Sequence, residues 1–251
     1  MPVRHLVQIT DLHIDADPHD RKQERDTLET LSRVVAAVRW EHPAPELVLA
    51  TGDLVDDGSP EAYARLKPVL LELGRPVSAI PGNHDLIELM AEHLADETIT
   101  LALAHDLDPW RIVMLNSTVE GEAHGHLDAE RLSALDAELS TAGQAHVLVV
   151  MHHQPTPIGS PLDEVGLDNA PGLYEVLDRH AHVRGLLWGH IHHVHDSTRN
   201  GVRLLGTPST CVQFKSDPTE AFGYTDEPPA FRRLALHDDG RIETEVVWVE
   251  A

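Results

Sequence analysis

Five short apolar runs in this chain each end directly in a turn that carries aspartate, asparagine or histidine, and this repeat constrains the fold most. Each run has the length and apolar content of a buried strand, and polar turns and helical patterns separate several of the runs. In open α/β sheets, sites form in the crevice beyond the carboxyl ends of the strands. Side chains that are far apart in the sequence can therefore meet there. The runs are residues 5–10, 46–51, 77–80, 146–151 and 185–188.

Helical patterns follow several of these runs. Thr27–Trp40 carries apolar residues at helical spacing, and Pro60–Leu73 begins with a proline, which is well placed in the first turn of a helix. Shorter helices are expected at 128–139 and 173–180. Beyond residue 200 the pattern changes to β-strands separated by turns, and we expect this tail to complete a second sheet. The expected tail strands are residues 202–205, 210–214, 231–236 and 243–249.

Domain organisation is predicted from length and from the distribution of polar residues. A chain of 251 residues with 41% apolar residues can bury one sizeable core, and there is no internal repeat. We expect one domain over residues 1–251. The polar, proline-containing stretch 216–229 is expected to be a surface loop or lid.

Charge and composition limit the classes of molecule that this chain is expected to bind. The chain has 42 acidic and 19 basic side chains, and its formal charge of -23 argues against a nucleic-acid partner. A small phosphate would need a pocket that supplies its own cations. There is no apolar run of about 18 residues, so no membrane partner is expected. The single Cys211 cannot form an internal disulfide, which favours a reducing cytoplasm.

The side chains at the ends of the runs are typical metal ligands. Carboxylate, imidazole and amide oxygen suit Mn, Fe or Zn, and the lack of thiolates argues against a structural zinc site. Seven ligands are too many for one catalytic ion, whereas two ions about 3.5–4 Å apart can share a bridging carboxylate and clamp a phosphate. Two divalent ions would also leave the site net positive. The candidate metal ligands are Asp11, His13, Asp53, Asn83, His152, His190 and His192.

Each motif has a purely structural alternative. Asp11 and His13 alone could belong to a turn that caps a helix, and a Gly-Asp turn such as the one at Asp53 is common. With 19 histidines in the chain, an isolated histidine is weak evidence. His190 and His192, however, lie on the same side of an extended segment, an arrangement that suits a metal. The five motifs together favour a functional site.

The motifs, in this order and at this spacing, resemble those of the calcineurin-like metallophosphoesterases, over about residues 5–212. The resemblance implies an α/β fold, a four-layer α/β/β/α sandwich of two mixed β-sheets flanked by helices. It also implies two divalent or mixed-valence transition-metal ions, with Fe or Mn expected and Zn as an alternative. The motifs are Asp11-Leu12-His13, Gly52-Asp53, Gly82-Asn83-His84-Asp85, His152 and Gly189-His190-Ile191-His192.

The same resemblance implies roles for these residues. Asp53 would bridge the two ions, and a hydroxide held between them would attack phosphorus. His84 would protonate the leaving oxygen, with Asp85 orienting its imidazole. Asn83 and His84 would contact the substrate. Apart from the resemblance, His195 neighbours the motifs in the sequence and is the further histidine that we expect to reach the substrate phosphate. Asp11, His13, Asp53 and His192 would hold one ion, and Asp53, Asn83, His152 and His190 the other.

Two flanking runs point to a narrower group. Residues 52–63 and 207–215 look like those of the bacterial class III cyclic-AMP phosphodiesterases, and the second run is not required by metal binding. This resemblance implies hydrolysis of cyclic AMP to 5'-AMP. Other small esters, such as glycerophosphodiesters or 2',3'-cyclic nucleotides, remain alternatives, as does a non-catalytic binding module of the same fold. The sequence leaves open whether the chain forms a homodimer.

Overall fold

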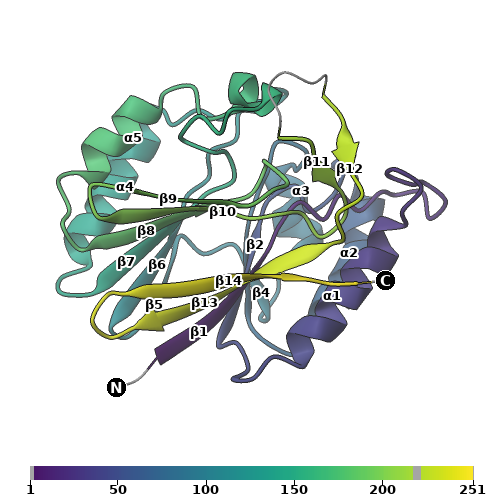
Figure 1. Cartoon of the computed structure of the whole chain (residues 1–251), viewed down its shortest axis with the longest axis horizontal. Helices are drawn as coiled ribbons and strands as arrows, with labels where there is room; N and C mark the ends of the chain where they lie inside the picture. Colours follow the sequence, from purple (N-terminus) through teal and green to yellow (C-terminus); the bar gives the residue numbers. More distant parts are fainter. Residues whose placement is uncertain (1–2, 217–221, 251) are drawn as a thin grey trace.

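Two six-stranded mixed sheets lie face to face in the structure, a computed structural model that describes residues 3–216 and 222–250 (Figure 1). In the first sheet β1 to β4 are parallel, and the two strands of the tail are antiparallel to their neighbours. The strand order of this sheet is β14 (Ile242–Trp248), β13 (Ala230–His237), β1 (Val3–Ile9), β2 (Leu47–Thr51), β3 (Val77–Ile80) and β4 (Ile99–Thr100).

The second sheet has four parallel strands between two antiparallel edge strands. A separate hairpin pairs β11 (Gln213–Phe214) with β12 (Tyr224–Thr225). The strand order of the second sheet is β5 (Ala104–Leu107), β6 (Trp110–Met114), β7 (His146–Val150), β8 (Val183–Trp188), β10 (Val202–Gly206) and β9 (His195–Arg199).

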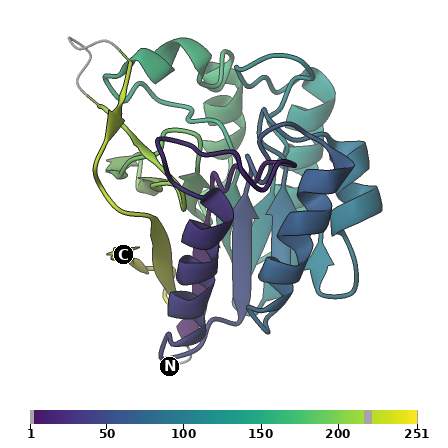
Figure 2. The ribbon, with the colours of Figure 1, turned by 90° about the vertical axis from the view of Figure 1, so that its right-hand side faces the viewer.

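Helices cover the outer face of each sheet, which completes the four expected layers. Figure 2 shows α1 and α2 in front of the first sheet. One apolar core lies under these helices, a second lies under α4 and α5, and a third joins the two sheets. The helices are α1 (Thr27–Arg39), α2 (Pro60–Leu71), the short α3 (Ile87–Leu89) with η1 (Met90–Leu94), α4 (Ala129–Thr141), η2 (Pro161–Val165) and α5 (Ala170–Leu177).

The long helices begin where their sequences supply a cap. Asp26 accepts hydrogen bonds from the backbone of Leu28 and Glu29 at the start of α1. Ser59 caps α2 and Asp128 caps α4 in the same way. Side-chain caps satisfy backbone N–H groups that have no partner within the helix. The starts of the long helices were therefore readable from the sequence.

The tail differs from the expectation that it completes the second sheet. β10 does join that sheet, but β13 pairs with β1 and carries β14 onto the first sheet. The edge of β1 that faces away from β2 was open to an antiparallel partner. The strand expected at 210–214 is only β11, because the residues before it bond to the loop after β1.

The loop or lid expected at 216–229 lies partly outside the described residues, which omit 217–221. Within it, β12 pairs with β11. In the described part of the chain, no helix combines the length and apolar character needed to cross a bilayer.

Candidate metal centre

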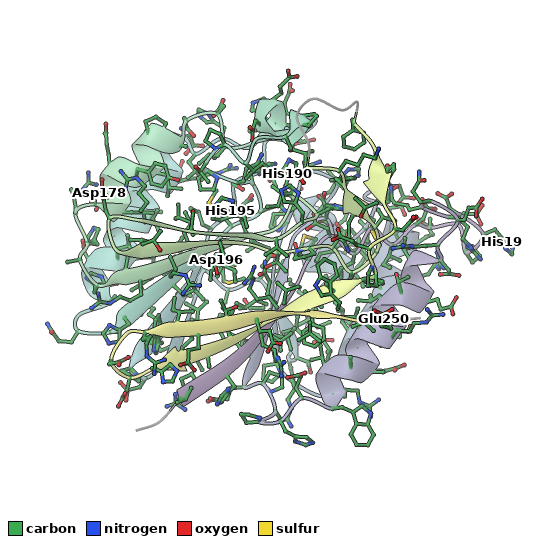
Figure 3. The ribbon with its side chains drawn as sticks, viewed as in Figure 1. His19, Asp178, His190, His195, Asp196 and Glu250 are labelled. Carbon is green, nitrogen blue, oxygen red and sulfur yellow. The ribbon has the colours of Figure 1, made fainter. Side chains whose placement is uncertain are left out.

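The loops after β1, β2, β3, β7 and β8 converge at one end of the two sheets. Possible ligand atoms from these loops form four overlapping groups, and within each group the atoms lie within 4.8 Å of one another. Figure 3 shows His190 in the upper central part of the molecule, between the two helical layers. The groups are Asp11, His13 and His192; His13, Asp53 and His84; Asp11, Asp53 and His152; and His152, His153 and His190.

One set of donor atoms gathers around one carboxylate oxygen of Asp53. Asp53 Oδ2 lies 3.7 Å from Nε2 of His13. That nitrogen lies 3.2 Å from Nε2 of His192, which is 3.4 Å from Oδ1 of Asp11. All four side chains are buried. This set is the one expected to hold the first ion.

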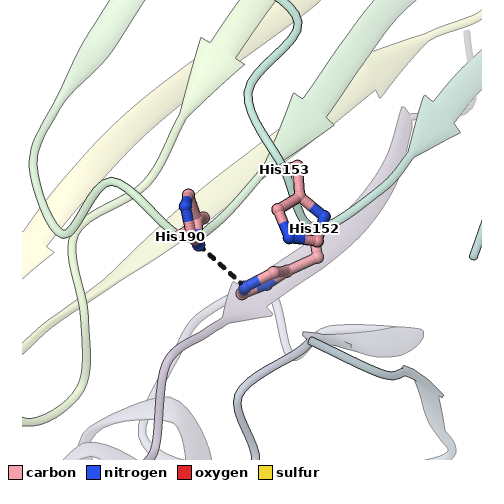
Figure 4. Close-up of side chains that lie close together, drawn as sticks. All are labelled: His152, His153 and His190. Atoms are coloured by element: carbon pink, nitrogen blue, oxygen red, sulfur yellow. Dashed lines mark hydrogen bonds between the residues drawn. The ribbon is translucent and has the colours of Figure 1, made fainter. Parts of the chain in front are cut away.

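A second set gathers around the other oxygen of Asp53. Asp53 Oδ1 lies 3.4 Å from Nε2 of His152. The same nitrogen lies 3.2 Å from Oδ1 of Asn83 and 3.3 Å from Nδ1 of His190 (Figure 4). Asp53 therefore faces both sets, one with each oxygen, as a bridging carboxylate would.

These spacings fit metal coordination. Nitrogen donors about 2.0–2.1 Å from a tetrahedral ion are about 3.3 Å apart, close to the separations within each set. Imidazole nitrogens that face each other across 3.2–3.3 Å gain little unless a cation or a proton lies between them. The donor set thus fits two ions.

Hydrogen bonds at the opposite ring nitrogens set the tautomers of three histidines. His152 Nδ1 donates to the carbonyl of Thr51 at 2.8 Å, and His192 Nδ1 donates to that of Val212 at 2.6 Å. His13 Nδ1 donates to the carboxylate of Asp56 at 2.9 Å. In each ring the lone pair of Nε2 is left free toward the centre, as metal-binding histidines require.

Backbone strain is concentrated at the same residues. Eight non-glycine residues in the described chain have positive φ, and five of them are candidate ligands. Non-glycine residues adopt this conformation rarely, and such strain clusters at functional sites. The surrounding hydrogen bonds hold the ligands there: the backbone N–H of His190, for example, donates to both carboxylate oxygens of Asp11. The five are Asp11, His13, Asp53, His190 and His192.

Two glycines are required by close packing of the loops. Gly52 has φ of +93°, and a Cβ there would overlap the ring of His152. A Cβ on Gly82 would overlap the backbone nitrogen and carboxylate of Asp53. A side chain at either position would push ligands apart. These glycines are therefore part of the site's construction and not simple turn residues.

Burial and neighbouring charges set the protonation of the ligands. Burial lowers the pKa of His13, and it lowers that of His190 to about 3. Burial alone would raise the pKa of Asp53, but the charge of the adjacent His152 holds it well below its usual value. His13 and His190 are thus neutral and the central carboxylate is ionised, which are the forms that bind a cation. Burial would lower the pKa of His152, but the charge of Asp53 raises it to about 9, so an ion that binds there would displace a proton from this ring.

His84 lies beside the donor sets and is more exposed than they are, with 37% of its side chain accessible. Its Nδ1 donates to the backbone carbonyl of Asp56 at 2.7 Å, and its backbone N–H donates to Asp53 Oδ1 at 3.0 Å. Nε2 of His84 takes part in neither of these two bonds. Asp56 was not among the residues singled out from the sequence, although it lies three residues after Asp53.

Asp85 differs from the expectation that it orients His84. Its buried carboxylate instead accepts hydrogen bonds from the backbone of Leu54, Val55 and Gly82 and from the hydroxyl of Tyr63. Burial and the charge of Asp53 raise its pKa to about 6. The carboxylate points back into the junction of two loops because those four donors converge there. Asp85 thus ties the loop after β2 to the loop after β3.

His195, expected to contact the substrate, begins β9 and belongs to none of the four groups. Its Nε2 bonds to Ser197 Oγ at 2.8 Å, and its ring lies 5.3 Å from that of Trp188. In Figure 3 it lies to the left of His190, over the second sheet. The proposed contact with substrate stays a prediction.

The run 207–215 makes hydrogen bonds to the loop after β1 and to His192. Ser209 Oγ donates to the carbonyl of Asp11 at 2.7 Å, and the backbone N–H of Thr210 donates to that of Thr10. Val212 supplies the carbonyl that fixes the tautomer of His192. This run therefore positions two candidate ligands without being one of them.

The sequence model of the calcineurin-like phosphoesterases matches residues 4–194. The chain belongs to this family. Among its curated relatives, the 3',5'-cyclic adenosine monophosphate phosphodiesterases CpdA of Pseudomonas aeruginosa and Escherichia coli K12 are 39% and 40% identical to it. The matches cover 98% and 96% of this chain and 90% and 88% of the relatives. A 3',5'-cyclic-nucleotide phosphodiesterase of Nostoc is 36% identical, with 96% of this chain and 91% of the relative covered.

Solved structures show the same fold at low identity. A dimetal phosphatase from Danio rerio superposes with a TM-score of 0.67 at 17% identity, with 100% of both chains covered. A purple acid phosphatase from yellow lupin gives a TM-score of 0.68 at 11% identity, covering 98% of this chain and 54% of the other. The four-layer fold expected from the sequence is confirmed.

Proposed function

We propose that this protein is a metal-dependent phosphodiesterase that hydrolyses 3',5'-cyclic nucleotides, with cyclic AMP converted to 5'-AMP. The observation that carries the proposal is the pair of donor sets that share Asp53, one on each carboxylate oxygen. Relatives named as cyclic-AMP phosphodiesterases match this chain over nearly its whole length. The geometry supports the chemistry, and the relatives support the substrate.

The seven candidate ligands divide between two ions as the two donor sets do. Fe and Mn suit their oxygen and imidazole donors, and Zn is compatible with them. When bound, such a pair of ions supplies Lewis acidity toward the phosphate and a water activated near neutral pH. One ion would be held by Asp11, His13, Asp53 and His192, and the other by Asp53, Asn83, His152 and His190.

His84 is placed to move the proton that the reaction requires. Hydrolysis of a 3',5'-cyclic diester forms a bond between the water oxygen and phosphorus and breaks the bond to the ribose 3'-oxygen, which must gain a proton. The carbonyl of Asp56 accepts the Nδ1–H of His84, so the proton would come from Nε2 of the imidazolium, the form of His84 that carries a proton on both ring nitrogens. We place Asp85 in a supporting role, because its carboxylate is fully engaged by the loops.

The setting of the reaction follows from charge and composition. A chain with a formal charge of -23 repels nucleic acid over most of its surface, so we propose a small diester as the substrate. We also propose a single domain over residues 1–251 and a cytoplasmic location, in keeping with the one cysteine, Cys211, which is buried and unpaired.

Hydrolysis by the purified, metal-supplemented protein tests this function. Cyclic AMP, cyclic GMP, a 2',3'-cyclic nucleotide and bis(p-nitrophenyl) phosphate would be compared by kcat/KM, with Asp53→Ala as the inactive control. We expect 3',5'-cyclic nucleotides to be preferred, with 5'-AMP as the product from cyclic AMP. A preference for the 2',3'-cyclic substrate, or binding without turnover, would replace the proposal with one of the alternatives.

A further inference from the structure

Exposed apolar side chains lie close in the sequence to the residues of the metal centre. Leu86 and Ile87 follow His84 by two and three residues, and Val194 follows His192 by two. Exposed single apolar residues are common, and these three are neighbours of the candidate site residues in the sequence.

An aromatic cluster on the β11–β12 hairpin contacts the metal centre directly and is made of Phe214, Phe222 and Tyr224. Phe214 stacks on the candidate ligand His192, with ring centres 3.9 Å apart and planes 18° apart. The rings of Phe222 and Tyr224 lie 4.9 Å and 5.5 Å from Phe214. The cluster thus extends outward from a ligand of the proposed first ion.

The hairpin that carries the cluster is fixed to the rest of the molecule. The guanidinium of Arg25 donates to the carbonyls of Cys211, Asp226 and Glu227, on both sides of the hairpin. The backbone N–H of Lys215 donates to the carbonyl of Gly223 at 2.8 Å. The aromatic rings are therefore held in place beside the centre.

Packing within the hairpin explains Phe214 but not Phe222. Phe214 is enclosed by His192 and the two other rings, whereas Phe222 is 52% exposed. The chain has only three phenylalanines and three tyrosines, and half of these six are in this cluster. A large aromatic side chain gains most from burial, so an exposed one beside a site has a face available to a ligand.

We propose that Phe222, supported by Phe214 and Tyr224, is the stacking surface for the nucleobase of the substrate. Phe214 stacks on His192, and Phe222 lies on from Phe214, so one aromatic ring separates Phe222 from a candidate metal ligand. In the substrate, one ribose likewise separates the nucleobase from the phosphate that the ions would bind. Aromatic side chains stack on any base, since every base has a π-face. This inference rests on the proposed function and explains how the site favours nucleotides over diesters without rings.

A nucleobase fits this surface better than a second copy of the chain does. Two molecules that each carry a formal charge of -23 repel each other. A purine base is uncharged and meets no such repulsion at the aromatic cluster. Stacking alone makes no hydrogen bond to base edges. Cyclic AMP and cyclic GMP are therefore expected to differ little through this contact.

The test compares substrates with and without a base. Wild type and Phe222→Ala would be assayed on cyclic AMP and on methyl riboside 3',5'-cyclic phosphate, which has the same reacting diester but no base. We expect Phe222→Ala to lower kcat/KM for cyclic AMP about 5- to 100-fold, mainly through KM, and to leave the base-free substrate unchanged. Phe222→Trp should retain the preference for cyclic AMP.

Trp40→Ala is the matched control and should change kcat/KM on neither substrate. Trp40 is an aromatic residue that is 79% exposed, and it follows the C-terminal end of α1, remote from the centre. If Phe222→Ala lowered kcat/KM equally on both substrates, Phe222 would have a structural role. If it lowered kcat/KM on neither, the base would not stack there. Either result overturns the inference, while turnover of cyclic AMP by wild type would still uphold the proposed function. If wild type cleaves bis(p-nitrophenyl) phosphate but not cyclic AMP, the proposed function fails and the base contact fails with it.

Discussion

Asp56 connects the proposed proton donor to the proposed metal ligands. Its carboxylate accepts hydrogen bonds from His13 Nδ1 at 2.9 Å and from Lys22 Nζ at 2.7 Å, while its backbone carbonyl accepts one from His84. Hydrogen bonds from His13 and Lys22 hold the pKa of Asp56 far below its usual value despite partial burial. The carboxylate is thus ionised and keeps the imidazole of His13 in the tautomer that presents Nε2 to the centre.

Replacing His84 by Ala should slow turnover without emptying the metal sites. The side chain lies outside both donor sets, and general acid catalysis contributes about 10²-fold or more, so kcat should fall by at least that factor. Metal content by elemental analysis and kcat on cyclic AMP would be measured together. His19→Ala, an exposed histidine in the loop after β1, is the control. If His84→Ala lost metal, His84 would instead be identified as a metal ligand.

Asp53 and Asn83 should differ in the number of ions lost on substitution. Asp53 faces both donor sets, so Asp53→Ala should lose both ions together. Asn83 contributes to the second set alone, so Asn83→Ala should weaken one ion and leave the other bound. Native mass spectrometry gives the stoichiometry directly. One ion retained by Asp53→Ala at full occupancy would disprove the bridge.

At the residue scale, the sequence predicted which side chains gather but not how each one points. The motif spacing identified seven candidate ligands, and the structure brings all seven together. The difference lay with Asp85, whose orientation depends on two backbone donors in the loop after β2, one in its own loop and the hydroxyl of Tyr63 in α2. Such contacts depend on the folded backbone, and the positive φ of Asp53 has no signature in the sequence except the glycine before it.

At the element scale, strand ends and loop glycines locate the ligands. β2 and β3 are parallel neighbours, so their loops start side by side, and only glycine allows the two loops to touch. The long elements were predictable because caps, prolines and apolar periodicity act locally. Short edge strands such as β4, with two residues, were not predictable, because their pairing depends on a neighbouring strand that local sequence does not specify.

Gly82→Ala tests whether loop contact controls the centre. The added Cβ would overlap the backbone and carboxylate of Asp53, so the loop after β3 must move and the shared ligand with it. We expect metal binding and activity to be lost, while the far-ultraviolet circular dichroism stays native. Gly143→Ala, whose Cβ meets nothing within 4 Å, is the control for a glycine in another loop; its positive φ gives strain but no collision. Full activity of Gly82→Ala would show that the loops can separate without cost to the site.

At the scale of the whole molecule, three apolar cores hold the two sheets and their helices, and the centre lies where both sheets end. β1, β2 and β3 of the first sheet and β7 and β8 of the second each supply a loop. The tail shows the limit of sequence reasoning here. The sequence predicted its strands but not that β13 would pair with the free edge of β1. Which sheet a strand joins depends on packing among all the layers.

Because ligands from both sheets would bind the same pair of ions, metal should stabilise the entire fold. An ion that binds only the folded state adds about 2.7 kcal/mol at 100 times its Kd, which corresponds to a rise in Tm of about 5–10 °C for a chain of this size. Thermal unfolding would be followed in the presence of chelator and after addition of Mn²⁺. We expect chelation to lower Tm and added Mn²⁺ to restore it in wild type, while Asp53→Ala should not respond to either. An equal response in the variant would place the stabilising ion somewhere other than at Asp53.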